Sequence, residues 1–238
     1  MIYKNIALII TTIIAITFIC SCNNSYQKKN SKINWLREWE KNNNTWKGMH
    51  FSPLEEKEFD SLKKFITNVM VPKGLNALVL EINYSFKFTS HPELAGTGFN
   101  KFQARQLTEL CHQNNIRLIP LFNCIGHQSD GGKNTFALLQ KYPKFDETPY
   151  VSADNNGIYC REWCPSNPDV YPIVFDLIDE IIDAFQADAI HVGMDEIFLL
   201  GDPNCQYCKG GDNAKIFADA VNRFHRHIVD EKGIEMHM

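Results

Sequence analysis

The sequence predicts an α/β protein whose parallel sheet is built from successive βα units. Short apolar runs alternate with amphipathic stretches of helical period, and long connections follow several of the runs. The chain has 238 residues, of which 44% are hydrophobic and 22% are charged, as in ordinary globular domains. We therefore expect one domain with one sizeable core.

Five segments are expected to form the strands of this sheet. Each is a short, mostly apolar run with polar or turn-forming residues on either side. The expected strands are Lys47–Phe51, Ala77–Asn83, Arg117–Asn123, Ala189–Met194 and Ile234–Met238.

Four amphipathic segments are expected to form helices that cover the sheet. Apolar residues recur at three- and four-residue steps from Phe59 to Val69, around Leu107–Cys111, from Ile173 to Phe185 and from Phe217 to Ile228. The connections after the second, third and fourth strands hold most of the Gly, Pro, His and paired Cys residues. Because loops at the carboxyl end of a parallel sheet usually carry the function, we expect the site there.

The amino-terminal residues differ from the rest of the chain. Lys4 precedes the apolar stretch Ile6–Ile19, which is short for a membrane span and has the length of a signal-peptide core. This stretch ends in ICSC, which resembles a bacterial lipobox, so residues 1–21 are expected to be a lipoprotein signal peptide. Cys22 would then be the lipidated residue. An ordinary cleaved signal is the alternative.

These features predict a three-part chain: the signal peptide, a polar tether of residues 22–45, and a domain of residues 46–238. The expected location is the bacterial cell envelope, with the protein lipid-anchored to a membrane and periplasmic or surface-facing. The net charge of −4 and the scattered Lys and Arg residues argue against nucleic acid as a partner.

The stretch AIHVGMDEI, residues 189–197, carries two adjacent acids at the end of a predicted strand. Strand alternation places His191, Gly193 and Asp195 on one face, so Glu196 can join them only where the chain turns out of the strand. Two carboxyls that converge repel each other, and burial disfavours their charge, so one is expected to stay protonated. An acid beside an anion is what glycosidic bond cleavage needs. The alternative is a pair that caps the next helix.

The strand with the acid pair resembles the H-x-G-G-D-E strand of family 20 glycoside hydrolases, the β-N-acetylhexosaminidases. A second block, NNIRLIPLFNCIGHQ, resembles that family's third strand through Ile119, Pro120, Gly126 and His127, and WKGMHFSPL and NALVLEINYSF are collinear with its first two strands. The resemblance runs from Trp46 to the last residue and covers the amino-terminal half of a (β/α)8 TIM barrel. It implies an incomplete barrel of about five strands and four helices.

This resemblance also implies an activity and a set of site residues. The activity is substrate-assisted, retaining hydrolysis of terminal 2-acetamido sugars in amino-sugar glycans, without a cofactor. Asp195 would orient the acetamido group, and Glu196 would act as general acid and then as base. The expected substrate-binding residues are Lys47, Asn123, His127, His191 and Tyr84.

Further expectations remain open at the level of sequence. An open barrel would leave strand edges free for self-association, and a chain of this length would be weakly active alone or a piece of a longer protein. The main rival function is a degenerate, non-catalytic glycan-binding lipoprotein. A metal-dependent hydrolase that uses His127, His191, Asp195 and Glu196 ranks lower, because the H-x-H pair usual in such barrels is missing.

Two close cysteine pairs lie in the loops at the predicted functional end. Cys160 and Cys164 precede the third predicted helix, and Cys205 and Cys208 follow the fourth strand. Four thiols in two pairs suit a tetrahedral zinc ion, whereas an oxidising compartment favours two disulfides. Either way, we expect the role to be structural.

Overall fold

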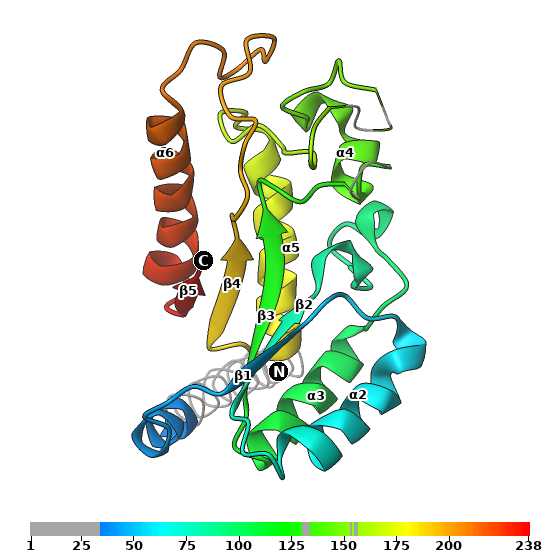
Figure 1. The fold of residues 1–238 in the computed structure, drawn as a ribbon, viewed down its shortest axis with the longest axis vertical. Helices are drawn as coiled ribbons and strands as arrows, with labels where there is room; N and C mark the ends of the chain where they lie inside the picture. Colours follow the sequence, from blue (N-terminus) through cyan, green and yellow to red (C-terminus); the bar gives the residue numbers. More distant parts are fainter. Residues whose placement is uncertain (1–33, 130–133, 153, 155–156) are drawn as a thin grey trace, which may run out of the picture. The chain divides into compact units, whose positions relative to one another are not determined.

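A parallel five-stranded sheet runs through the main body of the protein, as Figure 1 shows. The computed structural model describes residues 34–129, 134–152, 154 and 157–238. The strands lie in chain order and pair in parallel throughout. All five predicted strands are confirmed, as β1 (Gly48–Phe51), β2 (Ala77–Glu81), β3 (Arg117–Cys124), β4 (Ala189–Gly193) and β5 (Glu235–His237).

The four predicted helices are also confirmed. They are α2 (Phe59–Phe65), α3 (Lys101–Gln113), α5 (Val170–Phe185) and α6 (Asn213–His225), and two of them continue as the π-helical segments Ile66–Met70 and Arg226–Glu231. The structure adds the short helix α4 (Ala137–Lys141) and the 3-10 turns Glu56–Glu58, Asn83–Ser85, Pro92–Leu94 and Pro143–Phe145.

Local side-chain hydrogen bonds explain where two of the helices begin. Asn100 caps α3, because its side chain accepts from the backbone of Gln103 while the Gln103 side chain accepts from the backbone of Asn100. Asp212 caps α6 by accepting from the backbone N–H groups of Ala214 and Lys215 at 2.9 and 3.2 Å.

The core lies between one face of the sheet and the helices. Leu78, Leu80, Phe122 and Val192 are fully buried on that face, and α5 lies behind β3 and β4 in Figure 1. Because side chains alternate along a strand, the residues between them point to the other face. That face carries most of the polar side chains of the sheet, namely His50, Glu81, Arg117, Asn123, His191, Glu235 and His237.

Arg117 anchors the amino-terminal end of the sheet. Its buried guanidinium donates to Asp188 at 3.0 Å and to Glu235 at 2.9 Å, and it lies 5.3 Å from the ring of Trp46. These contacts join β3 to the start of β4 and to β5. Arg117, Asp188 and Glu235 therefore stabilise the sheet at this end.

The compact unit that contains the sheet runs from Trp46 to Met238. Before it, residues 34–42 form a helix in which Trp35 and Trp39 stack with ring centroids 6.4 Å apart. This part of the expected tether of residues 22–45 is helical, and the two tryptophans, four residues apart, give the helix an apolar stripe. The signal peptide and Cys22 lie outside the described residues. No helix in the described ranges is long and apolar enough to cross a membrane.

Candidate active site

Asp195 and Glu196 meet a histidine at the carboxyl end of the sheet. Nε2 of His127 lies 3.5 Å from Oδ2 of Asp195 and 3.6 Å from Oε2 of Glu196. His127 comes from the loop after β3, and the acids come from the loop after β4. Two chain segments thus place two carboxylates and one imidazole around a common point.

The backbone after β4 makes this convergence possible. Gly193, Met194 and Glu196 all have left-handed conformations, with φ of 65°, 67° and 52°. They turn the chain out of the strand, which allows two consecutive side chains to reach His127. This is the turn that the strand pattern requires. Glycine is needed at 193, because a Cβ atom there would lie 2.4 Å from Oδ1 of Asn123.

The acid pair does not cap a helix. The segment that follows Glu196 is irregular, and the next helix, α6, begins at Asn213 with Asp212 as its cap. The capping alternative is therefore excluded, and the two carboxyls remain available for a ligand.

Both carboxyls are open to solvent. The Asp195 side chain is 68% exposed and the Glu196 side chain is 47% exposed. The expectation that the acid pair is buried is therefore wrong for the described residues. Water screens the charges of exposed groups. Within the described residues, the electrostatic repulsion between the carboxylates of Asp195 and Glu196 is therefore weak.

Asn123 belongs to a hydrogen-bonded network centred on Glu81. Oε1 of Glu81 accepts from the side-chain amides of Asn83 at 2.6 Å and of Asn123 at 2.8 Å. The backbone N–H of Asn123 in turn donates to Oδ1 of Asn83 at 2.7 Å. Burial raises the pKa of Glu81, and His50, whose Nε2 lies 3.7 Å from Oε2 of Glu81, acts in the opposite direction. The structure thus fixes the orientation of the Asn123 amide.

Glu81 is a site residue that the sequence analysis missed. The signal was present, because this acid ends the otherwise apolar strand ALVLE. The register places Glu81 beside Leu121 of β3, which is beside His191 of β4, so all three lie at one level of the sheet.

His191 lies on β4, half-buried on the polar face. Its Nδ1 accepts a hydrogen bond from the backbone N–H of Gly193 at 3.0 Å. Burial lowers the pKa of His191, the nearby His237 and His50 lower it further, and Asp195 opposes them. The neutral ring is therefore favoured, with Nδ1 as acceptor and Nε2 as the N–H donor.

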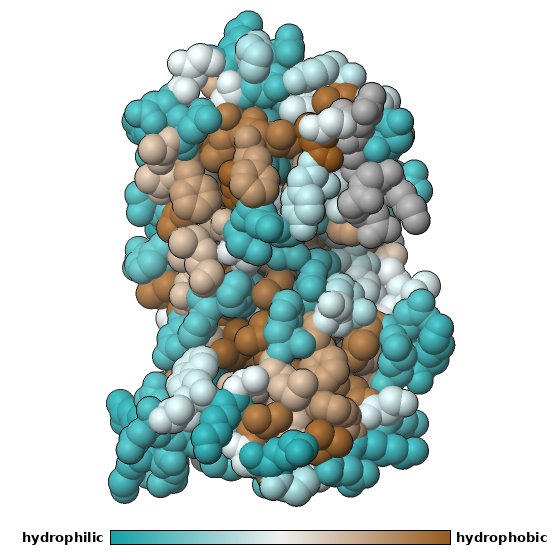
Figure 2. Space-filling view, viewed as in Figure 1, coloured by the Kyte–Doolittle hydropathy of each residue, from teal (hydrophilic) through white to brown (hydrophobic). Residues whose placement is uncertain are grey.

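Exposed aromatic rings stand beside the acids. Tyr159 makes an edge contact with His127 at a centroid distance of 6.2 Å and another with Phe198 at 6.4 Å. Glu196 raises the pKa of the Tyr159 hydroxyl through a hydrogen bond. In Figure 2, brown side chains gather over the loops that follow β3 and β4, in the upper part of the view. Such rings suit the faces of sugars.

Tyr84 supports the site from beneath and does not line it. Its side chain is buried, its hydroxyl donates to Oε1 of Gln128 at 2.7 Å, and its ring packs on Phe122. Gln128 then donates to the backbone carbonyls of Asn123 and Gly126 at 3.0 and 2.8 Å. Tyr84 is therefore corrected from a substrate-binding residue to a support of the loop that carries His127.

Lys47 lies at the amino-terminal edge of the sheet. It precedes β1, and its backbone N–H donates to Oδ1 of Asn76, which precedes β2. In a parallel sheet both positions are at the amino-terminal edge, opposite Asp195 and Glu196. Its assignment as a substrate-binding residue stays a prediction.

The four paired cysteines do not form one cluster. Cys164, Cys205 and Cys208 gather with Glu147, and their ligand atoms all lie within 4.8 Å of one another. Cys160 is buried apart from them: burial raises the pKa of its thiol, while a hydrogen bond from the backbone of His127 lowers it. All four thiols are free in the structure. The expected group of four cysteines was therefore wrong in one member, because Glu147 lies in the cluster and Cys160 does not.

A pocket of about 320 Å³ lies beside the acid pair. Neither Asp195 nor Glu196 lines it. Its walls come from the segment after β4 and from α6, namely Met194, Ile197, Phe198, Leu200, Asn213, Ala214 and Phe217.

Residues 69–220 match the family model described as glycosyl hydrolase family 20, catalytic domain. No curated protein matches the chain. Among solved structures, a β-N-acetylhexosaminidase is similar with a TM-score of 0.66 and 20% identity, covering 81% of this chain and 46% of that one.

Two further solved structures are similar to the chain. The β-N-acetylhexosaminidase of Bacteroides fragilis NCTC 9343 has a TM-score of 0.62 and 14% identity, covering 80% of this chain and 41% of that one. A mutant Streptomyces plicatus β-hexosaminidase in complex with its product, GlcNAc, has a TM-score of 0.61 and 16% identity, covering 81% and 38%. The chain thus spans less than half the length of each of these three structures.

Proposed function

Since the chain belongs to glycosyl hydrolase family 20, we propose that it carries the acid pair of a β-N-acetylhexosaminidase-type glycoside hydrolase. The proposed substrates are terminal 2-acetamido sugars of amino-sugar glycans. One observation carries the proposal: Asp195 and Glu196 both approach Nε2 of His127 at the carboxyl end of the parallel sheet. Active sites of barrel enzymes lie at that end.

The proposed reaction proceeds in two steps and needs no enzyme nucleophile. In the first, the oxygen of the 2-acetamido group attacks the anomeric carbon, and the Glu196 carboxyl donates its proton to the departing glycosidic oxygen. In the second, the Glu196 carboxylate takes a proton from water, which attacks the same carbon and restores the acetamido group. Two displacements at one carbon retain its configuration.

Asp195 has a separate role in this proposal. Its carboxylate accepts a hydrogen bond from the acetamido N–H, which orients the attacking oxygen and stabilises the positive charge that develops on the group. His127 contacts both acids and holds their separation, while Asn123 and His191 present a fixed amide and an N–H donor to sugar hydroxyls.

The second candidate is a sugar-binding protein without turnover. The 68% exposure of the Asp195 side chain and the 47% exposure of the Glu196 side chain favour it, because electrostatic catalysis weakens when water reaches the acids. A third reading, metal-dependent hydrolysis, draws on the closeness of His127, Asp195 and Glu196, whose ligand atoms lie within 4.8 Å of one another.

Hydrolysis of aryl 2-acetamido glycosides by the full chain, with and without a chelator, separates the three functions. Hydrolysis that survives chelation is expected for the hexosaminidase, and its loss on chelation supports the metal-dependent reading. Binding of GlcNAc in a titration without hydrolysis supports the binding protein.

Asp195→Asn refines the same assay. We expect this variant to lose far more activity on a 2-acetamido aryl glycoside than on the matched 2-hydroxy glycoside, because only the first substrate has the group that Asp195 orients. Equal losses on the two substrates would contradict the role given to Asp195.

The proposal extends to where the protein is and how it assembles. The lipobox-like ICSC supports a lipid anchor on Cys22 in the bacterial cell envelope. Strands β1 and β5 are the outer strands of the described sheet, and open sheet edges pair readily with other strands. We expect self-association, which light scattering on the purified protein will measure; a stable monomer would contradict it.

A further inference from the structure

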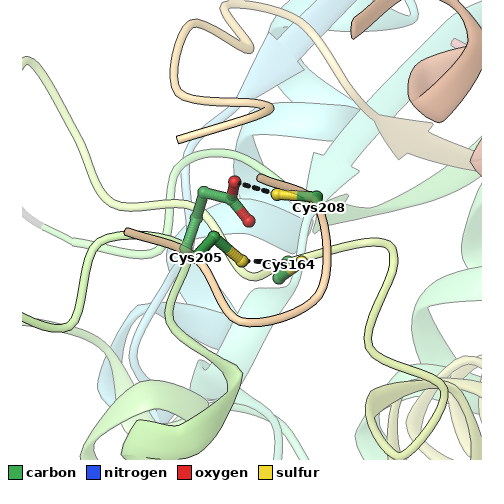
Figure 3. A group of neighbouring side chains, drawn as sticks. Cys164, Cys205 and Cys208 are labelled. Atoms are coloured by element: carbon green, nitrogen blue, oxygen red, sulfur yellow. Dashed lines mark hydrogen bonds between the residues drawn. The ribbon is translucent and has the colours of Figure 1, made fainter. Parts of the chain in front are cut away.

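Three thiols and one carboxyl converge in a buried cluster away from the acid pair. Cys164 comes from the segment before α5, Cys205 and Cys208 come from the segment after β4, and Glu147 lies between α4 and α5. Figure 3 shows the sulfur atoms of Cys205 and Cys164 turned toward each other and that of Cys208 turned toward a carboxylate. Sγ of Cys205 lies 3.4 Å from Sγ of Cys164, and Sγ of Cys208 lies 2.5 Å from Oε1 of Glu147.

Glu147 supplies a second, independent observation. Its side chain is fully buried, and its Oε2 atom has no hydrogen-bond partner among the described residues. Oε1 accepts from the backbone N–H of Asp202 at 3.2 Å. A buried carboxylate oxygen without a donor is costly, and a cation is one of the few groups that compensates for it.

A disulfide explains less of this arrangement. The sulfurs of Cys164 and Cys205, 3.4 Å apart, come from different loops. A bond between them would oxidise two thiols, and it would leave Cys208 and the unpartnered oxygen of Glu147 enclosed together. A metal ion uses all four groups.

We propose that Cys164, Cys205, Cys208 and Glu147 form a structural zinc site. Zinc prefers four ligands in a tetrahedron, with Zn–S distances of about 2.3 Å and Zn–O distances of about 2.0–2.2 Å. Ligand atoms in such a tetrahedron lie within roughly 4 Å of one another, close to the 4.8 Å limit that encloses these four. Binding releases the three thiol protons to solvent, and it closes the coordination sphere, so no position is left for a substrate.

The zinc ion would join two loops at the functional end of the sheet. Glu147 donates its backbone N–H to the carbonyl of Glu162 at 2.9 Å, and Oε1 of Glu162 accepts from the backbone N–H groups of Phe198 and Leu199. The segment that contains Asp195 and Glu196 is thus fastened to the segment that contains Tyr159 through these contacts and the four ligands. This site does not depend on the proposed hydrolase function.

Elemental analysis of the purified full chain tests the site. We expect about one zinc per chain in the wild type, and less than about a tenth of that in Cys208→Ser. Cys160→Ser is the matched control, because Cys160 is a buried thiol of the same loop as Cys164 but lies outside the cluster; it should keep its zinc. In the cobalt-loaded protein, sulfur-to-cobalt charge-transfer bands and the visible bands of a tetrahedral ion should appear, and they should be absent from Cys208→Ser.

Glu147→Gln separates a metal ligand from a mere hydrogen-bond acceptor. The glutamine oxygen can still accept from the Asp202 N–H, but it carries no charge, so we expect zinc affinity to fall by about tenfold or more. Unchanged affinity would remove Glu147 from the ligand set. Wild-type protein that contains no zinc, cannot be loaded with zinc or cobalt after thiol reduction, and shows a Cys164–Cys205 disulfide by mass spectrometry would overturn the proposal, even if Cys208→Ser fails to fold.

Discussion

Nδ2 of Asn123 donates a hydrogen bond of 2.8 Å to Oε1 of Glu81, which links β3 to β2 beneath the acid pair. The same oxygen accepts from Asn83. Because burial raises the pKa of Glu81, folding favours its protonated form. The folded state therefore loses stability relative to the unfolded state as pH rises above the ordinary carboxyl pKa, until the raised folded pKa is passed.

Glu81→Gln should remove this dependence. The glutamine oxygen can accept from both asparagines, while the charge that burial opposes is gone. We expect the free energy of unfolding of the variant, relative to wild type, to improve between pH 4.5 and neutral pH. His50, His127 and Asp195 also face Glu81, so urea unfolding of Glu81→Gln and wild type should be compared with His50→Gln across the same range. A parallel pH profile for Glu81→Gln and wild type would show that Glu81 does not cause the effect.

Glu196→Gln should abolish general acid catalysis. In an active preparation we expect a loss of about a hundredfold or more in rate for substrates with poor leaving groups, because their glycosidic oxygen needs a proton. Activated aryl substrates should lose less in the first step. Steady-state rates on a series of aryl 2-acetamido glycosides measure this difference, and a uniform small loss across the series would remove Glu196 from the acid role.

Gly193→Ala should destabilise the protein more than a left-handed backbone alone explains. Gly74 has nearly the same φ, 66° against 65°, but an added Cβ there meets nothing within 4 Å, whereas at Gly193 it would lie 2.4 Å from Oδ1 of Asn123. We expect a cost of about 1 kcal/mol for Gly74→Ala and at least about 2 kcal/mol for Gly193→Ala. Urea unfolding of both variants tests the steric contribution, and equal costs would contradict it.

Cys22→Ala tests the lipid anchor. The alanine variant has no thiol to acylate, so we expect it to leave the membrane fraction and to lose incorporation of labelled fatty acid. Cys20→Ala is the matched control, because it changes a neighbouring thiol in the same stretch and should keep the label. Equal labelling of Cys22→Ala and wild type would rule out Cys22 as the lipidated residue.

The strands and main helices were predictable because their signals are local. The run RLIPLFNC reads as a buried strand by itself, and the recurrence of apolar residues from Ile173 to Phe185 marks the buried face of α5. The helix of residues 34–42 escaped prediction, because a single pair of tryptophans is a weak periodic signal.

The parts that could not be predicted depend on contacts between distant segments. Nothing near Glu147 in sequence indicates that the chain returns to it with Cys205 and Cys208, and two adjacent pairs of cysteines made Cys160 look like their partner. The sequence predicted that Asp195 and Glu196 converge only if the chain turns after β4. Their exposure depends on what surrounds them in space, which the spacing of residues does not reveal.

The left-handed turn at Gly193 and Met194 determines the shape of the site, whereas other residues provide its reactivity. The backbone of these two residues determines where the next two side chains point, and those side chains supply the carboxyls. A descendant of this protein that replaces one of the two acids would therefore keep the same cradle beside His127. It would lose only the role of that acid, which is acetamido orientation for Asp195 and proton transfer for Glu196. Substitution at Gly193 would instead displace both acids in one step. Natural sequence variation should therefore be narrower at Gly193, which has no functional group, than at Asp195 and Glu196, which carry the carboxyls.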